Sequence, residues 1–204
     1  NLSPQPAATI GGIEGVTSAA DTMPQTAAPA TDLADTRRLV RLHGLSALLF
    51  LFVGLVALLF AYGAVAWPDA VGSSLAEYLS YGHSLPIGLN ALVYGWLTIG
   101  LTAVIYFFLP RLVATDLAFP RLAALNGLLM TAGVGVGIVA IAMGESAGGR
   151  MLEMPWYADA ALAVSFLTLA VIVTATVRRS SGDGVGVPVW YFLAASWWLF
   201  LSFT

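Results

Sequence analysis

Long apolar runs without any charge constrain this chain more than any other feature of its sequence. The first run, residues 45–67, contains no Asp, Glu, Lys or Arg. At about 1.5 Å per residue a helix of this length spans roughly 34 Å, enough to cross a hydrocarbon core about 30 Å thick. Four further runs follow, at residues 85–109, 122–143, 160–177 and 187–204. The sequence therefore predicts an all-α, polytopic bundle of five transmembrane helices.

The composition also indicates a chain that is embedded in a lipid bilayer. Of the 204 residues, 59% are hydrophobic and only 9% are charged, whereas about a quarter of the residues in soluble domains are charged. The chain has no Cys, which excludes disulfides, thiolate metal sites and cysteine nucleophiles. Its net charge of −3 is too small to indicate a strongly basic or acidic partner, and we expect no nucleic-acid partner.

The first 36 residues differ sharply from the rest. They are rich in Ala, Pro and Thr and contain four acidic residues but no basic one. Such a segment cannot bury enough apolar surface to offset the entropy lost on ordering. We therefore expect a disordered tail at residues 1–36, followed by a five-helix transmembrane domain at residues 37–204 whose last helix is incomplete at residue 204.

Arginine side chains mark the loops on one side of the predicted membrane. All eight basic residues are Arg, and seven of them precede the first helix or lie in the second and fourth loops: Arg37, Arg38, Arg41, Arg111, Arg121, Arg178 and Arg179. The first loop has no Arg, and the third has only Arg150. Because cytoplasmic loops carry an excess of Arg and Lys, we predict a cytoplasmic N-terminus in a multi-pass protein of a prokaryotic inner membrane.

The two histidines are the first candidates for binding a cofactor. His43 lies at the start of the first predicted helix beside Arg41, and we interpret it as an interfacial contact with lipid headgroups. His83 lies at the outer start of the second helix, where both a structural role and haem ligation are open. Since the two residues are predicted on opposite faces of the membrane, they cannot be the two axial ligands of one haem.

Polar and small residues occupy two of the predicted helices. The second carries four polar side chains near helical spacing: Asn90, Tyr94, Thr98 and Tyr106. Their polar atoms would be costly against lipid, so we expect them to face protein. The third carries small residues that suit close contact with a helix of a partner: Gly127, Gly133, Gly135 and Gly137. No ionisable residue lies in the middle of a span, which argues against a self-contained transporter or pump.

Four short segments together resemble a known family. Residues 79–94 read LSYGHSLPIGLNALVY, which resembles the start of the second helix in subunit I of haem–copper oxidases, and most of all the C family, the cbb-type cytochrome c oxidases. The motif at residues 156–159, WYAD, preceded by Glu153, is similar to the start of that family's fourth helix. PVWYFLA at residues 188–194 resembles the start of its fifth helix, and AWP at residues 66–68 the end of its first.

One departure from the family pattern concerns a haem ligand. The family places a low-spin haem ligand, a His, two residues before the position that Asn90 matches, and here that residue is Gly88. In the alternative register of the B family the position is Pro86. Neither side chain can bind iron, so His83 is left as a speculative haem ligand or haem-edge contact. The resemblance implies that the remaining haem and copper ligands lie beyond Thr204, and we expect no cofactor and no catalytic centre in this chain alone.

Three functions are compatible with these features. The resemblance implies the N-terminal helices of a terminal oxidase subunit I, in a complex that reduces dioxygen or nitric oxide with electrons from a cytochrome. Its partners would be other membrane subunits and a c-type cytochrome, and its cofactors haem and copper in the full complex. The first alternative is a haem-less structural subunit of a larger respiratory or photosynthetic complex. The second is a transporter or channel subunit.

The predicted topology can be tested by labelling single cysteines. A Cys placed at position 72 should react with an impermeant thiol reagent added from outside, and a Cys at position 181 should not, because the two loops are predicted on opposite sides of the membrane. The Cys-free wild-type chain is the control for background labelling. The reverse pattern would contradict both the topology and the alignment with the oxidase helices.

Overall fold

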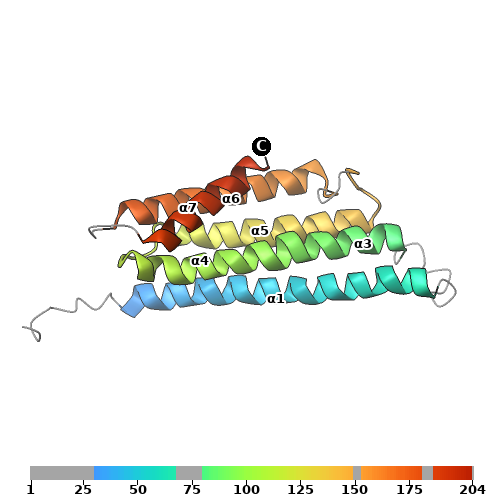
Figure 1. The fold of residues 1–204 in the computed structure, drawn as a ribbon, viewed down its shortest axis with the longest axis horizontal. Coiled ribbons are helices and arrows are strands. Elements are labelled where there is room, and N and C mark those ends of the chain that lie inside the picture. Colours follow the sequence, from blue (N-terminus) through green and yellow to red (C-terminus); the bar gives the residue numbers. More distant parts are fainter. Residues whose placement is uncertain (1–29, 68–79, 149–152, 181–185, 204) are drawn as a thin grey trace, which may run out of the picture.

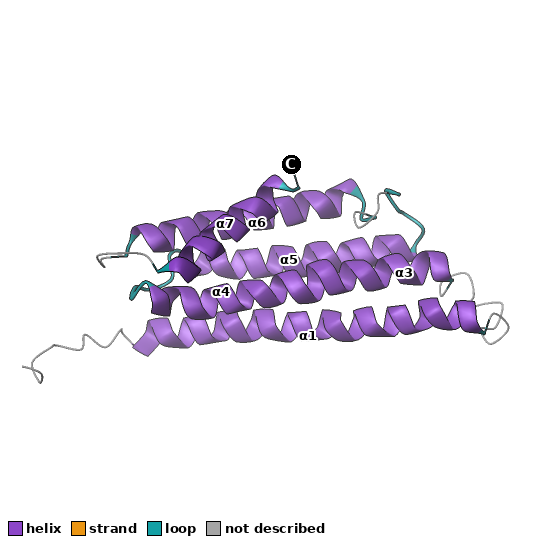
Figure 2. Cartoon of the chain, in the orientation of Figure 1, coloured by secondary structure: helices purple, strands orange, loops and turns teal. Residues whose placement is uncertain are grey.

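Each charge-free run forms a helix in the computed structural model, which describes residues 30–67, 80–148, 153–180 and 186–203 (Figure 2). Within these ranges all regular secondary structure is helical. The predicted all-α bundle of five helices is therefore confirmed. Four segments are long and apolar enough to cross a membrane: Thr36–Ala66, Tyr81–Leu112, Pro120–Ala142 and Trp156–Arg178.

Apart from α1, the helices begin and end within a few residues of the predicted runs. The elements are α1 (Ala30–Ala66), α3 (Tyr81–Asn90), η2 (Ala91–Thr98), α4 (Ile99–Leu112), α5 (Pro120–Ala142), α6 (Trp156–Arg178) and α7 (Val187–Leu201). The consecutive elements α3, η2 and α4 make up one membrane-length helix, called helix two below. Helix α1 begins at Ala30, ahead of the predicted domain boundary at residue 37, and residues 1–29 of the predicted tail lie outside the described residues.

The helices lie side by side in the order of the sequence (Figure 1). Helix α1 packs along the whole of helix two, α5 packs on α6, and α7 packs on α6 and on α4. Smaller contacts join α5 to α1 and to α3. The order places α1 at one edge of the bundle and α6 with α7 at the other. Every pair of sequential helices is thus in direct contact, as short connections favour.

Helix two contains a widened segment in its middle. Residues Ala91–Thr98 are π-helical, so their backbone hydrogen bonds reach one residue further than in an α-helix. The Thr98 hydroxyl donates to the Val93 carbonyl oxygen at 2.8 Å, five residues earlier, within this wider turn. Segments of this kind are frequent at functional positions, and here the segment lies against α1.

Glycines let α1 and helix two approach closely. A Cβ atom at Gly88 would lie 2.7 Å from Cγ and Cδ2 of Leu58 and 3.2 Å from the Gly54 carbonyl oxygen. The relation is reciprocal, because a Cβ at Gly54 would lie 2.7 Å from Cγ of Leu92 and 3.2 Å from the Gly88 carbonyl oxygen. Further along, a Cβ at Gly95 would overlap the Phe50 side chain. Small residues at such points allow the backbone-to-backbone contacts that hold membrane helices together.

The glycines of α5 serve a contact within the chain. A Cβ at Gly133 would lie 3.3 Å from the Ala161 Cβ on α6, and one at Gly137 would overlap Met154, just before α6. Gly135, by contrast, has nothing within 4 Å of a Cβ placed on it. The prediction that Gly133 and Gly137 contact a partner protein is therefore wrong, because α6 of the same chain already covers them.

A buried polar network joins three helices. The Tyr106 hydroxyl on α4 donates to Oδ1 of Asn126 on α5 at 3.0 Å. The Asn126 amide donates in turn to the Ser165 carbonyl oxygen on α6 at 2.6 Å and to the Thr168 hydroxyl at 3.1 Å. Tyr106, Asn126 and Ser165 are fully buried. Since lipid offers no hydrogen bonds, these polar atoms stabilise the bundle only because they are paired with one another.

We predict that Gly137→Leu destabilises the folded chain itself. The added side chain would push Met154 and α6 outward, at a cost of about 1–3 kcal/mol in the free energy of unfolding. Unfolding by SDS in mixed micelles, followed by circular dichroism, measures this cost. Gly135→Leu is the matched control on the same helix and should change the stability by much less. Equal losses in the two variants would contradict the assignment of Gly137 to the α5–α6 contact.

Candidate functional site

The two histidines lie at opposite ends of the bundle. Helix two runs antiparallel to α1, since Gly88 faces Leu58, Gly95 faces Phe50 and Gly100 faces Ala47. His83, in the first turn of α3, therefore lies beyond the level of Leu58, at least fifteen residues along α1 from His43. At about 1.5 Å per residue this separation exceeds roughly 20 Å. One haem cannot be ligated by both histidines.

His43 is buried between helices and is not exposed to lipid. Its side chain is only 3% exposed, and its Nδ1 lies 2.9 Å from the Leu39 carbonyl oxygen one turn earlier. The imidazole packs edge-on against the Tyr106 ring, with centroids 5.3 Å apart, and lies over Gly127 of α5. The interpretation of His43 as an interfacial contact is therefore wrong, because the ring turns inward between α1 and α5.

His83 lies at the other end of the bundle, at the start of helix two. It is half-buried, and its Nδ1 lies 3.2 Å from the Ser80 hydroxyl oxygen. Ser80 is also the N-cap residue of α3, although its side chain makes no capping hydrogen bond to the backbone. The contact with Ser80 is consistent with a structural role for the His83 ring at the start of the helix. A role of His83 as a haem ligand or haem-edge contact stays a prediction.

Position 88 has no room for a ligand or for haem beside it. The motif resemblance places the family's helix-two His at Gly88, where even a single carbon atom would meet the Leu58 side chain at 2.7 Å. Gly88 is buried against α1, so this face of helix two contacts a helix. A haem at this position does not fit the arrangement of the residues present. Within the described ranges there is also no cluster of three His, Cys, Asp or Glu side chains that could hold a metal ion.

Polar side chains gather at the end of the bundle that holds His83. The Asn90 amide nitrogen donates to a Glu153 carboxylate oxygen at 2.6 Å and to the Pro86 carbonyl oxygen at 2.8 Å. Asn90 is only 1% exposed. This contact fixes the segment before α6 against helix two, across a sequence separation of 63 residues. The Glu153 and Asn90 of the oxidase-like motifs are thus brought together.

The polar residues of helix two face protein, as predicted. Asn90, Thr98 and Tyr106 are buried, and each has a partner described above. Tyr94 stacks edge-on against Phe203 at 5.4 Å between centroids. Two buried oxygen atoms at this end, Oδ1 of Asn90 and Oδ1 of Asp159, have no hydrogen-bond partner among the described residues.

Comparison with known proteins identifies the same group that the motifs indicated. Residues 38–204 match the family model described as "Cytochrome C and Quinol oxidase polypeptide I". The chain is also similar to "Cbb3-type cytochrome c oxidase subunit CcoN1" from Stutzerimonas stutzeri, with 23% identity over 163 residues. This alignment covers 80% of the chain and 34% of the relative. The chain therefore spans about a third of the length of this curated relative.

The Asn90–Glu153 contact can be measured with a double-mutant cycle. We expect Asn90→Ala and Glu153→Ala to lose a shared interaction of about 0.5–2 kcal/mol, the range seen for hydrogen bonds within membrane proteins. SDS unfolding of the two single variants and the double variant gives the coupling energy. The control pair is Asn90 and Glu145. The Glu145 carboxylate lies at the same end of the bundle but accepts a hydrogen bond from Tyr157 instead. Additive effects of Asn90→Ala and Glu153→Ala would show that the contact does not form.

Proposed function

Because this chain belongs to the family of cytochrome c and quinol oxidase polypeptide I, we propose that its five helices are the N-terminal scaffold of a subunit I-like membrane protein in a respiratory electron-transfer complex. The similarity to a cbb3-type subunit supports the C family within this group. In this proposal the helices shape the membrane domain and contribute packing surfaces, while the cofactor ligands come from elsewhere in the complex.

The observation that carries the proposal is the contact at Gly88. Where the family has a haem-ligating His, this chain has a residue without a side chain, and Leu58 and Gly54 of α1 fill the adjacent space. A His at this position would meet the Leu58 side chain and the Gly54 carbonyl oxygen of α1, so Leu58 would have to turn away. The glycine that stands in place of the haem ligand is thus also the residue that lets α1 pack closely. This double effect supports a scaffolding role.

Reduction of dioxygen or nitric oxide, with electrons from a cytochrome, belongs in this proposal to the complete complex. The absence of a three-ligand group within the described ranges supports placing the ligands of any haem–copper centre outside this chain. The expected partners are other membrane subunits and a c-type cytochrome, in a prokaryotic inner membrane with the N-terminus on the cytoplasmic side.

A haem-less structural subunit of a larger respiratory or photosynthetic complex is the second candidate. The same packing at Gly88 favours it, because this chain could keep the helix arrangement of the family without ligating a haem. The two candidates differ in whether the complex that holds the chain also holds a haem–copper centre. The family match gives no support to a transporter or channel subunit.

Haem content tests the scaffolding role directly. We expect the purified chain to show no Soret band at one haem per chain, and Gly88→His to create none, since Leu58 occupies the space beside it. In the intact complex, His83→Ala should leave the haem content unchanged by pyridine haemochrome assay. Loss of one haem per chain in His83→Ala, or a stoichiometric haem in the isolated chain, would show that these helices do ligate the cofactor.

A further inference from the structure

A groove of about 360 Å³ lies between the first turns of α1 and α5. One arginine from each helix lines it, Arg38 from α1 and Arg121 from α5. The space between the two arginines is apolar, with Leu39, Leu42 and Ala124 in its lining. Leu39 is buried, whereas Leu42 and Ala124 are exposed. The groove therefore opens toward whatever surrounds the bundle, which in a membrane is lipid.

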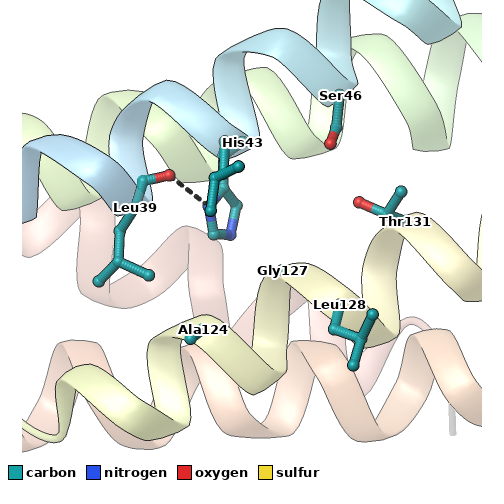
Figure 3. Close-up of a pocket in the computed structure, with 8 residues that line it drawn as sticks. Leu39, His43, Ser46, Ala124, Gly127, Leu128 and Thr131 are labelled. Carbon is teal, nitrogen blue, oxygen red and sulfur yellow. Dashed lines mark hydrogen bonds between the residues drawn. The ribbon is translucent and has the colours of Figure 1, made fainter. Parts of the chain in front are cut away.

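The groove continues inward as the cavity that Figure 3 shows. Three of its apolar lining residues also line a space of about 240 Å³ between the same two helices. That space extends to Ser46 on α1 and Thr131 on α5 (Figure 3). Both residues lie about 15 Å inside the spans that begin at Thr36 and Pro120. Because this is half of a hydrocarbon core about 30 Å thick, the groove extends through the depth of one lipid leaflet.

The two arginines lie at the level of lipid headgroups. Arg38 and Arg121 are each within about 3 Å of the start of their spans, measured along the helix axis. Both are exposed, and no Asp or Glu is among the described residues that line the groove or its inner part. Two cations beside one uncharged space make a local positive potential, which attracts an anion from the headgroup layer.

A second apolar groove adjoins Arg121 on the side of α6. It has a volume of about 660 Å³, and Phe119, Leu122 and Val171 line it beside Arg121. The Arg179 guanidinium lies over the Phe119 ring, 5.1 Å from its centroid, and adds a third positive charge at this end. No carboxylate is among the described lining residues here either. Arg121 thus lies where two apolar grooves meet.

A diacyl phospholipid has the charge and the shape that this arrangement fits. Its phosphate accepts the charge-assisted, paired hydrogen bonds that a guanidinium donates. Its two acyl chains leave from one glycerol, as the two grooves leave from Arg121. An ammonium or choline headgroup would bring a further cation beside three arginines, with no carboxylate in either lining to pair with it. A headgroup with a net negative charge is therefore favoured over a zwitterionic one.

We propose that Arg38 and Arg121 bind the phosphate of an anionic diacyl phospholipid, with one acyl chain in the α1–α5 groove and the other in the α5–α6 groove. Basic pockets between transmembrane helices are sites of this type, and phosphatidylglycerol is a simple lipid of this class. The site goes beyond the scaffolding role, and it depends neither on haem nor on the reaction of the complex.

Photolabelling of the intact complex tests the occupant. The complex is placed in phosphatidylcholine nanodiscs with phosphatidylglycerol that carries a diazirine midway along one acyl chain, and adducts are located by peptide mass spectrometry after illumination. We expect saturable adducts on α1 between Leu42 and Ser46 and on α5 between Ala124 and Thr131. Unlabelled phosphatidylglycerol should compete at a concentration about fivefold lower than phosphatidylethanolamine, which has no net charge.

Charge variants test the phosphate contacts. Arg38→Gln and Arg121→Gln should each reduce the labelling of α1 and α5 about fivefold, because each removes one arginine near the membrane surface. Arg37→Gln removes the same charge from the neighbouring residue, which is not among those that line the groove. This matched control should change the labelling by less than about twofold, since it acts only through the screened potential.

A volume change tests the acyl-chain contact. Ala124→Leu adds apolar volume inside the α1–α5 groove and should displace the labelled chain from α1 and α5. Ala132→Leu is the matched control, because Ala132 is also exposed on α5 but is not among the residues that line the groove or its inner part. Equal labelling in the two variants would show that no acyl chain occupies the groove.

Three further results would overturn the proposal. Equal competition by phosphatidylglycerol and phosphatidylethanolamine, or equal losses in Arg37→Gln and Arg38→Gln, would show that the charges select no headgroup. Competition by soluble glycerol 3-phosphate would assign a site for a free phosphate ester instead of a lipid. An absence of adducts on α1 and α5 in the intact complex would show that another protein segment covers the groove.

Discussion

The close contact between α1 and helix two determines how the rest of this membrane domain is arranged. Gly54 and Gly88 face each other so closely that each carbonyl oxygen lies 3.2 Å from where the other's Cβ would be. In lipid, where no hydrophobic force draws helices together, such close approach is a main source of association. Leu58 and Leu92 pack on either side of it. The contact holds α1 along helix two and occupies the position that the oxidase family gives to a haem ligand.

Buried polar atoms impose the second constraint, because lipid leaves each of them to be paired within the protein. Some bond to carbonyl oxygens of their own helix, as Thr98 and Ser196 do, and others bond to a different part of the bundle. Tyr106 pairs with Asn126 and Asn126 with α6, while Asn90 pairs with Glu153 at the other end of the bundle. Three buried atoms have no hydrogen-bond partner among the described residues: Nε2 of His43, Oδ1 of Asn90 and Oδ1 of Asp159.

The helices and the family could be predicted from the sequence, because charge-free runs of membrane length permit few other folds. The absence of a side chain at residue 88 was also visible, but the Leu58 contact that fills the space was not, since it depends on the register between two helices. His43 was misplaced for a related reason. Its neighbour Arg41 indicated the interface, whereas the ring's burial depends on Gly127, 84 positions later on another helix. Periodicity within one helix likewise could not show that Gly133 and Gly137 face α6 of the same chain, nor that residues Ala91–Thr98 are π-helical.

The central claim is that α1 occupies the haem-ligand position of helix two, so that this chain acts as a scaffold. A cryo-electron microscopy map of the intact complex from native membranes tests it most directly. The account predicts that Leu58 lies in van der Waals contact with Gly88 and that no haem density adjoins this face of helix two. A haem next to residue 88, with α1 displaced from Gly54 and Leu58 turned away, would contradict it.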